Sequence, residues 1–431
     1  TSTMDALRTT VERIDPSEII IANDIFDTHK PFLESFADRI SVQDDYVFDM
    51  GNASERLINS QKNLRAEDLS ELTETEIVSC SALIDYVLRT QKGKIPYIAA
   101  PQKIHDGTVM DIDAATRKNL EITKTLSGER KGSLLDTIDR TITGAGARLL
   151  QSFLSAPLAN VAEINDRLDK VECYVEQKEL RDILRDYLRS IPDMARALSR
   201  LTLDRGGPKD LAVIRDGLSL SEIIRAELQY NTAAKTVFDG ILKFLHQSPD
   251  VAALQDRLKQ ALEETPPTLA RDGGFVREGY SAKLDDLRKL RNNSRTHIAS
   301  LQSKYQEETQ INGLKIKYNN VLGYFIEVTS KHADALMVGK GNDDEKVSRF
   351  VHRQTMANAV RFTTPELAEL ERDILSAAEK ITAIENSIFD ELVTQTIRSC
   401  EKIGHIAHAI AQIDVFAALA TLAEDYNYTR P

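Results

Sequence analysis

The sequence predicts a mainly α-helical protein in which two long helices carry a small β module. Three observations lead to this fold class: a helical run from Gly279 to Gln310, a glycine-punctuated β pattern over residues 311–363, and a second long helix that begins at Thr364 and Pro365. At about 1.5 Å per residue, about thirty helical residues reach roughly 45 Å. Because one globular core does not need that length, we expect an antiparallel stalk with the β module at its end. The alternative, in which both helices lie on one large core, stays open.

The composition indicates a folded chain of several domains without a general affinity for polyanions. Of the 431 residues 42% are hydrophobic, and the formal net charge is −12. This charge excludes a uniformly basic nucleic-acid binder, so any nucleic-acid contact has to be local. Cys80, Cys173 and Cys400 form no CxxC pair, which suits a reducing, cytoplasmic location. No apolar run approaches the length of a membrane span, and no signal peptide is visible, so we expect no membrane partner.

Residues 1–103 have an α/β pattern. We expect a buried strand at Ile19–Ala22, a short helix at Thr28–Phe36, a second strand at Val42–Asp49 and a helix at Glu74–Thr90 that stops by Gly93. These strands are too few for a complete doubly wound sheet.

From Asp111 the pattern changes to successive helices. They are expected at residues 161–178, 180–189, 193–202, 208–228, 234–246 and 250–263. A tight turn at Arg271–Gly274 precedes the stalk. After the stalk, Ile403 to Asp425 is apolar on most sides, as a core helix is.

The stalk helices have clear signals at their ends. Thr364 can cap the second helix, Pro365 suits its first position, and Glu366 lies in the first turn, where the helix dipole favours an anion. Gly313 stands where the cap of the first helix is expected. The apolar seam of the second helix repeats at alternating spacings of three and four residues: Leu367, Leu370, Ile374, Ala377, Ile381, Ile384 and Ile388. The first helix has apolar residues at similar spacings: Leu284, Leu287, Ile298, Leu301 and Tyr305.

The β module, residues 311–363, is the basic part of this acidic chain. Leu314, Ile316 and Tyr318 alternate with Lys315 and Lys317, which predicts a half-buried strand with a basic outer face. Further strands are expected at Tyr324–Thr329, Val347–Gln354 and Val360–Thr363, with a polar loop at 339–346. The module holds eight lysines and arginines against five acidic residues, a balance of +3, so the other residues carry −15 of the total of −12.

Catalytic motifs are absent from the sequence. There is no GxxxxGK[ST] phosphate loop, because Gly128–Ser133 has the wrong spacing, and there is no GxSxG or HExxH. His405 and His408 are three apart on an apolar helix, and a core or surface role is favoured over metal binding. An aspartate group could form a two-metal nuclease site, although turn and cap roles are more common for such residues: Asp24, Asp27, Asp44, Asp45 and Asp49. We therefore expect no catalytic residue and no metal site.

Several ordered segments resemble the MutS family of DNA mismatch-repair proteins, over essentially the whole chain. The segments are Met110–Ile122, Leu134–Leu150, Ala156–Leu158, Arg196–Arg200, Pro208–Leu211, Thr265–Gly274, Leu322–Ile326, Arg353–Thr355 and Arg361–Leu367.

The resemblance implies a domain assignment. Residues 1–103 are similar to most of the connector, which is ribonuclease-H-like in shape without that activity. Residues 104–310 would form the core and the first lever helix, residues 311–363 the clamp, and residues 364–431 the second lever helix and the return to the core. The mismatch-wedge and ATPase domains of the family have no counterpart here, so the chain is expected to be a middle fragment.

The resemblance also implies the function and the partners. It implies a role in DNA mismatch repair, a clamp that grips the duplex DNA backbone, a second MutS protomer, and a MutL-type repair partner. ATP and Mg²⁺ would belong to the family's ATPase domain, so this chain is expected to need no cofactor and to be no enzyme. A structural coiled-coil arm whose tip binds protein or RNA is the alternative.

The candidate DNA-binding residues are Lys315, Lys317, Arg353, Asn358 and Arg361. The four cations suit phosphate contacts, which position a protein without reading sequence. Asn358 and Arg361 match the family's clamp pattern. One departure stands beside them: where the family commonly has lysine after Gln-Thr-Leu, this chain has Ala357, and Lys340 or Lys346 are the candidates that could compensate.

Overall fold

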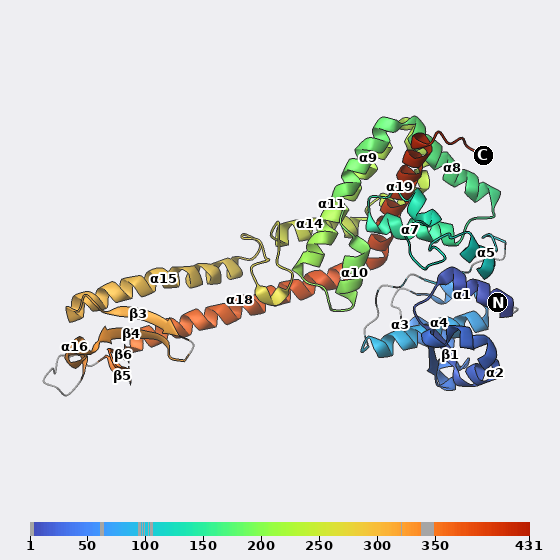
Figure 1. Ribbon diagram of the computed structural model, residues 1–431. Helices are drawn as coiled ribbons and strands as arrows, with labels where there is room; N and C mark the ends of the chain where they lie inside the picture. Colours follow the sequence, from blue (N-terminus) through green and yellow to red (C-terminus); the bar gives the residue numbers. More distant parts are fainter. Residues whose placement is uncertain are drawn as a thin grey trace. The chain divides into compact units, whose positions relative to one another are not determined.

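The computed structural model describes residues 4–60, 64–93, 96, 98, 100, 101, 103, 107–319, 321–337 and 349–431. Helices dominate it (Figure 1). The chain divides into two compact units, residues 1–259 with 392–431 and residues 260–391. The mainly helical fold class predicted from the sequence is confirmed.

The first unit begins with a small α/β segment. Its two parallel strands, β1 and β2, pair with Ile19 opposite Ile40. The elements are α1 (Met4–Ile14), β1 (Ile19–Ala22), α2 (Asn23–Leu33), η1 (Glu34–Arg39), β2 (Ile40–Gln43), η2 (Asp45–Phe48), α3 (Ala53–Ser60), η3 (Ala66–Leu69) and α4 (Glu74–Thr90). The helix at Glu74–Thr90 is confirmed, and Gly93 closes it with φ +82°.

Two expectations for this segment are wrong. β1 is only half-buried, apart from Ala22, because a two-stranded sheet cannot cover it. The strand expected at Val42–Asp49 stops at Gln43, and a 3₁₀ turn follows in which the N–H of Val47 donates to the carbonyl of Asp44 over 3.0 Å. That turn contains Val47, which is completely buried.

The rest of the first unit is a helical assembly. Its helices are α5 (Ala114–Asn119), α6 (Leu134–Ile138), α7 (Gly144–Ser155), α8 (Val161–Glu176), α9 (Lys178–Ser190), α10 (Met194–Thr202), α11 (Pro208–Tyr230), α12 (Thr232–Val237), α13 (Asp239–Leu245), α14 (Pro249–Ala261) and α19 (Cys400–Asp425). The expectation of a single helix at 234–246 is wrong, because the structure has two helices, α12 and α13, in this range. The break lies at Phe238, whose fully buried ring lies 4.7 Å from that of Tyr174.

Helix α19 is the core helix that its composition predicts. Among the described residues it is the one helix long and apolar enough to cross a membrane, yet 72% of its most apolar window is buried in the protein. Asp414 is fully buried on α19 and accepts hydrogen bonds from the backbone N–H groups of Ile142 (3.0 Å) and Thr143 (2.7 Å). This carboxylate thereby fixes the start of α7 against α19. Burial raises the pKa of Asp414 above its usual value, and the hydrogen bonds oppose that shift.

The second unit contains the stalk. Helix α15 (Ala282–Thr309) and helix α18 (Pro365–Arg398, within this unit as far as Glu391) run antiparallel (Figure 1). The hydroxyls of Tyr305 and Thr364 lie 2.7 Å apart at one end, and Arg288 Nη2 lies 2.7 Å from Glu385 Oε1 at the other. Tyr305, near the end of α15, lies beside the start of α18, whereas Arg288, near the start of α15, contacts the later part of α18. These contacts confirm that the two helices pack antiparallel.

The predicted seam and N-cap are confirmed, and the C-cap is not. Leu367, Ala377, Ile381 and Ile388 are buried on α18. The N–H of Leu367 donates to Thr364 Oγ1 over 3.1 Å, so Thr364 caps the helix as expected. The first helix ends instead at Gln310, which adopts the left-handed conformation with φ 58°, so the chain turns back three residues before Gly313. This early turn brings Ile311 and Leu314 into the core of the β module.

The β module is a four-stranded antiparallel sheet. Its strands are β3 (Lys315–Asn319), β4 (Gly323–Thr329), β5 (Val351–Thr355) and β6 (Ala359–Thr363), in the order β3-β4-β6-β5. Helix α16 (Ser330–Ala333) and η5 (Asp334–Leu336), which we did not expect, follow β4. The expected loop at 339–346, with Lys340 and Lys346, lies outside the described residues, as do the first two residues of the strand expected at 347–354.

Candidate nucleic-acid interface

The two faces of the sheet have different neighbours. Alternate residues of β4 and β6, including Ile326, Val328 and Phe362, are buried against the helix residues Tyr305 and Leu367. Burial raises the pKa of Tyr305 to about 12, so its hydroxyl stays protonated beside Thr364. Since side chains alternate along a strand, the residues between the buried ones form the opposite face. We call this face, made by Lys315, Lys317, Phe325, Glu327 and Arg361, the outer face.

The strand register brings three of the predicted residues together on the outer face. Lys315 of β3 and Arg361 of β6 both lie opposite Glu327 of β4, one on each side. Lys317 lies opposite Phe325 on the same face. Tyr318 lies on the same face as Ile316, as predicted, opposite Tyr324. Because it stands beside the β3–β4 hairpin it is 54% exposed, and its ring lies 5.0 Å from that of Tyr324.

A carboxylate organises these cations. Lys317 Nζ lies 2.6 Å from Glu327 Oε1, and Arg361 Nε lies 3.3 Å from Glu327 Oε2. Arg361 Nη1 also donates to Gln354 Oε1 over 3.0 Å, and its guanidinium lies 4.4 Å from the centre of the Phe325 ring. The hydrogen bond from Lys317, with that from Arg361, holds the pKa of Glu327 below its usual value against the effect of burial. The carboxylate is therefore ionised at neutral pH.

Arg353 and Asn358 lie on the β5–β6 hairpin, apart from this cluster. Arg353 stands at an irregularity of β5, where the pairing with β6 shifts between His352 and Gln354, and it is exposed. Asn358 is exposed in the connecting turn, and its carbonyl accepts from the N–H of Ser330 over 3.3 Å. Ala357, where the family commonly has lysine, is in the same turn. The candidate set is thus a cluster of three cations and a separate hairpin pair.

The sequence analysis missed two members of this site: Phe325 and Glu327. The alternation along 324–329 contained the signal, because Phe325 and Glu327 have the opposite parity to Ile326 and Val328. The partner of Glu327 across β6, Arg361, could not be found without the register of the sheet.

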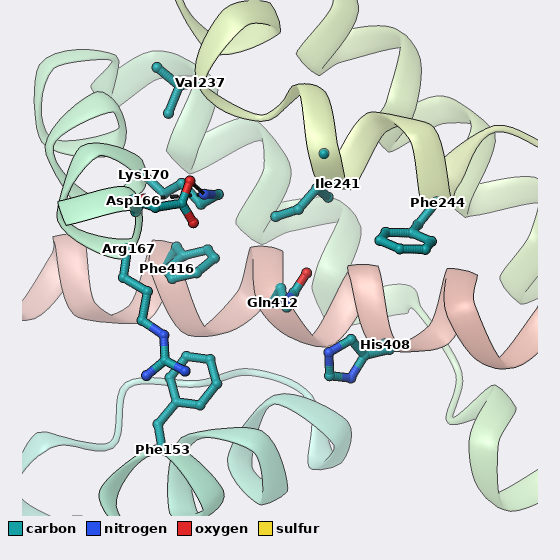
Figure 2. Close-up of a pocket in the computed structure, with 11 residues that line it drawn as sticks. Phe153, Asp166, Arg167, Lys170, Val237, Ile241, Phe244, His408, Gln412 and Phe416 are labelled. Atoms are coloured by element: carbon teal, nitrogen blue, oxygen red, sulfur yellow. Dashed lines mark hydrogen bonds and ion pairs between the residues drawn. The ribbon is translucent and has the colours of Figure 1, made fainter. Parts of the chain in front are cut away.

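Of the two histidines considered for metal binding, His408 lines a pocket of about 380 Å³ in the first unit. Figure 2 shows His408 on the same helix as Gln412 and Phe416, and Arg167 beside Phe153. The guanidinium carbon of Arg167 lies 3.5 Å from the centre of the Phe153 ring. Burial lowers the pKa of His408, and the neighbouring His405 adds to this shift. The ring of His405 lies 5.3 Å from that of Phe244. Within the described part of the chain no three His, Cys, Asp or Glu side chains are arranged to hold a metal ion.

Two of the aspartates considered for a nuclease site accept hydrogen bonds from backbone N–H groups. Asp45 Oδ1 accepts from the N–H of Asp24 over 3.2 Å, and Asp49 Oδ1 accepts from the N–H of Gly51 over 3.1 Å. These are the turn and cap roles that the sequence analysis favoured for such residues.

Comparison with known families identifies the family of the chain. Residues 115–420 match the family model of MutS domain III, and residues 1–99 match that of MutS domain II. The chain belongs to the MutS family. The resemblance inferred from the ordered sequence segments is therefore confirmed.

Three curated relatives share the name DNA mismatch repair protein MutS. The protein from Rhodopseudomonas palustris (strain HaA2) is 44% identical over 428 residues, which cover 99% of this chain and 46% of the relative. The protein from Nitrobacter winogradskyi is 43% identical over 426 residues, with 99% and 47% coverage. The protein from Bradyrhizobium sp. (strain ORS 278) is 42% identical over 427 residues, with 99% and 46% coverage. This MutS-family chain thus spans about half the length of the curated relatives it matches.

Proposed function

We propose that this chain takes part in DNA mismatch repair as a non-catalytic segment that grips the duplex DNA backbone. The observation that carries the proposal is the clustering of Lys315, Lys317 and Arg361 on one sheet face of an otherwise acidic chain. The two lysines are exposed, and the Arg361 side chain is 18% exposed. Lysine and arginine at this spacing suit phosphate oxygens. The relatives' printed name supports the repair role.

The assignment of parts follows from this role. Residues 311–363 act as the clamp, α15 and α18 act as the lever, residues 104–310 and 364–431 supply the core with the lever, and residues 1–103 form the connector. The proposal includes a cytoplasmic location, a second MutS protomer and a MutL-type partner. Arg353 and Asn358 make further backbone contacts from the β5–β6 hairpin.

The test is the salt dependence of duplex binding. Three neutralised phosphates give a log–log slope of roughly −3, at about 0.9 per phosphate. Arg361→Ala should weaken binding to all duplexes alike and flatten that slope by about one. Fluorescence anisotropy of a labelled duplex over a series of low salt concentrations measures both quantities.

Arg372→Ala is the matched control, because Arg372 is an exposed arginine on α18 that is not part of the outer face. It should change the slope by much less than Arg361→Ala. Full affinity and slope in Arg361→Ala, or a loss that depends on base sequence, would contradict the proposed phosphate contact. Binding of a protein or RNA ligand without binding of duplex DNA would favour the structural-arm alternative.

We also expect the chain not to hydrolyse ATP. In the glycine-bounded segment Gly128–Ser133, the N–H of Gly132 donates to Asp136 Oδ2 over 3.0 Å, and the hydroxyl of Ser133 accepts from the N–H of Asp136 over 3.2 Å. The Asp136 carboxylate therefore already accepts from the backbone N–H of Gly132, which a phosphate would need as a donor. A phosphate-release assay checks this. Turnover that follows the protein through a second purification step would overturn the expectation.

A further inference from the structure

The outer face contains one acidic side chain, and it lies at the centre of the cations. Glu327 has Lys315 directly opposite on β3, Arg361 directly opposite on β6, and Lys317 within 2.6 Å of its carboxylate. Its side chain is only 19% exposed, whereas that of Lys317 is 51% exposed. The acid therefore sits below the level of the lysine and in contact with two of the three cations.

This arrangement has an effect in the free protein. Three cations on adjacent strands repel one another, and an opposite charge between them relieves that repulsion. Both carboxylate oxygens are used, because Oε1 accepts from Lys317 and Oε2 accepts from Arg361. Glu327 thereby holds the ammonium and the guanidinium on one face.

The same carboxylate has the opposite effect on an approaching phosphate. It repels the phosphate, and it occupies donors of Lys317 and Arg361 that the phosphate needs. Arg361 has a further donor bound to Gln354. The outer face thus contains three cations, but it attracts a phosphate less strongly than three unopposed cations would.

We propose that Glu327 limits the affinity of the outer face for DNA phosphates by competing for Lys317 and Arg361. This inference rests on the proposed function and adds to it a carboxylate, within the binding face itself, that lowers the affinity for DNA. A grip weakened in this way releases the duplex more readily than three unopposed cations would. Replacing the carboxylate should make the β module less stable, because the cations would then repel one another without compensation.

The test is Glu327→Gln in the whole chain. The amide keeps the shape of the side chain and one oxygen that can still accept from Lys317 or Arg361, so the sheet should fold. We expect affinity for a labelled duplex at low salt to rise by about five-fold and the log–log slope to steepen by about one, since one phosphate contact gives about 0.9. We also expect the thermal midpoint to fall.

Two further variants test whether the negative charge at position 327 is what limits duplex affinity. Glu307→Gln makes the same chemical change at an exposed position of α15 that is not part of the outer face, and it should leave affinity within twofold. Glu327→Asp keeps the negative charge with a shorter side chain, and it should keep the low affinity. If Glu307→Gln raises duplex affinity as much as Glu327→Gln does, the increase comes only from the change in net charge, and the proposal is overturned.

The outcomes distinguish this inference from the function beneath it. If Arg361→Ala weakens binding but Glu327→Gln does not strengthen it, Glu327 is only structural and the inference fails while the DNA contact stands. If neither variant changes duplex affinity, the outer face does not bind DNA and both proposals fail. A gain in Glu327→Gln that disappears when Lys317→Ala and Arg361→Ala are added supports the competition.

Discussion

Ile381→Pro is expected to disrupt α18 and to separate the β module from its support. Ile381 is 5% exposed in the middle of the 34-residue helix. Proline removes one backbone hydrogen bond and clashes with the preceding turn, at a cost of about 3 kcal/mol or more. Far-ultraviolet circular dichroism should show reduced helicity, and limited proteolysis should cut within α15 or α18.

Two alanine variants show whether the seam itself contributes. Ile381→Ala removes buried side-chain contacts and should cost about 2–4 kcal/mol. Leu375→Ala changes a side chain that is 51% exposed on the same helix, and it should cost no more than about 0.5 kcal/mol. Equal stability of these two variants in urea unfolding would contradict the packed seam.

Glu385→Ala is expected to release the turn that precedes α15. Glu385 is 2% exposed, and it accepts from Arg288 Nη2 over 2.7 Å and from the N–H of Gly274 over 3.0 Å. The turn needs glycine, because Gly273 and Gly274 have φ +64° and +72°. Removing the carboxylate leaves Arg288 with the Val276 carbonyl at 2.8 Å and Asp285 at 3.6 Å. The loss of one buried hydrogen-bond partner is expected to cost about 1–3 kcal/mol.

Glu379→Ala is the control for this variant, because Glu379 is an exposed acid on the same helix. Hydrogen exchange of Gly274 reports the release directly, since its N–H loses its acceptor. Unchanged exchange and stability in Glu385→Ala would show that the turn is held by its glycines alone.

The sequence by itself determined most of the helical architecture. The heptad spacing of α18 requires a continuous helix with one apolar side, and Thr364–Pro365 marks its start, because hydroxyl caps and fixed φ values act within one turn. The apolar stretch of α19 predicted a core helix for the same local reason. The basic strand with Lys315 and Lys317 was also visible, since alternation is a property of neighbouring residues.

Tertiary structure decided the features that depend on distant neighbours. The break at Phe238 follows from packing on Tyr174, 64 positions earlier in the numbering, and the end of α15 at Gln310 follows from burial of Ile311 and Leu314. No local rule selects Gln310 over Gly313 for the left-handed position, because glycine has the lower intrinsic cost.

The candidate site divides in the same way. The cations Lys315, Lys317 and Arg361 were predictable from charge and alternation. Their convergence on Glu327 was not, because it depends on β4 lying between β3 and β6 in one register. A shift of one residue in that register would turn Glu327 or its partners to the buried face. The residue types come from the sequence, and their joint electrostatics come from the pairing of strands that only the folded chain brings together.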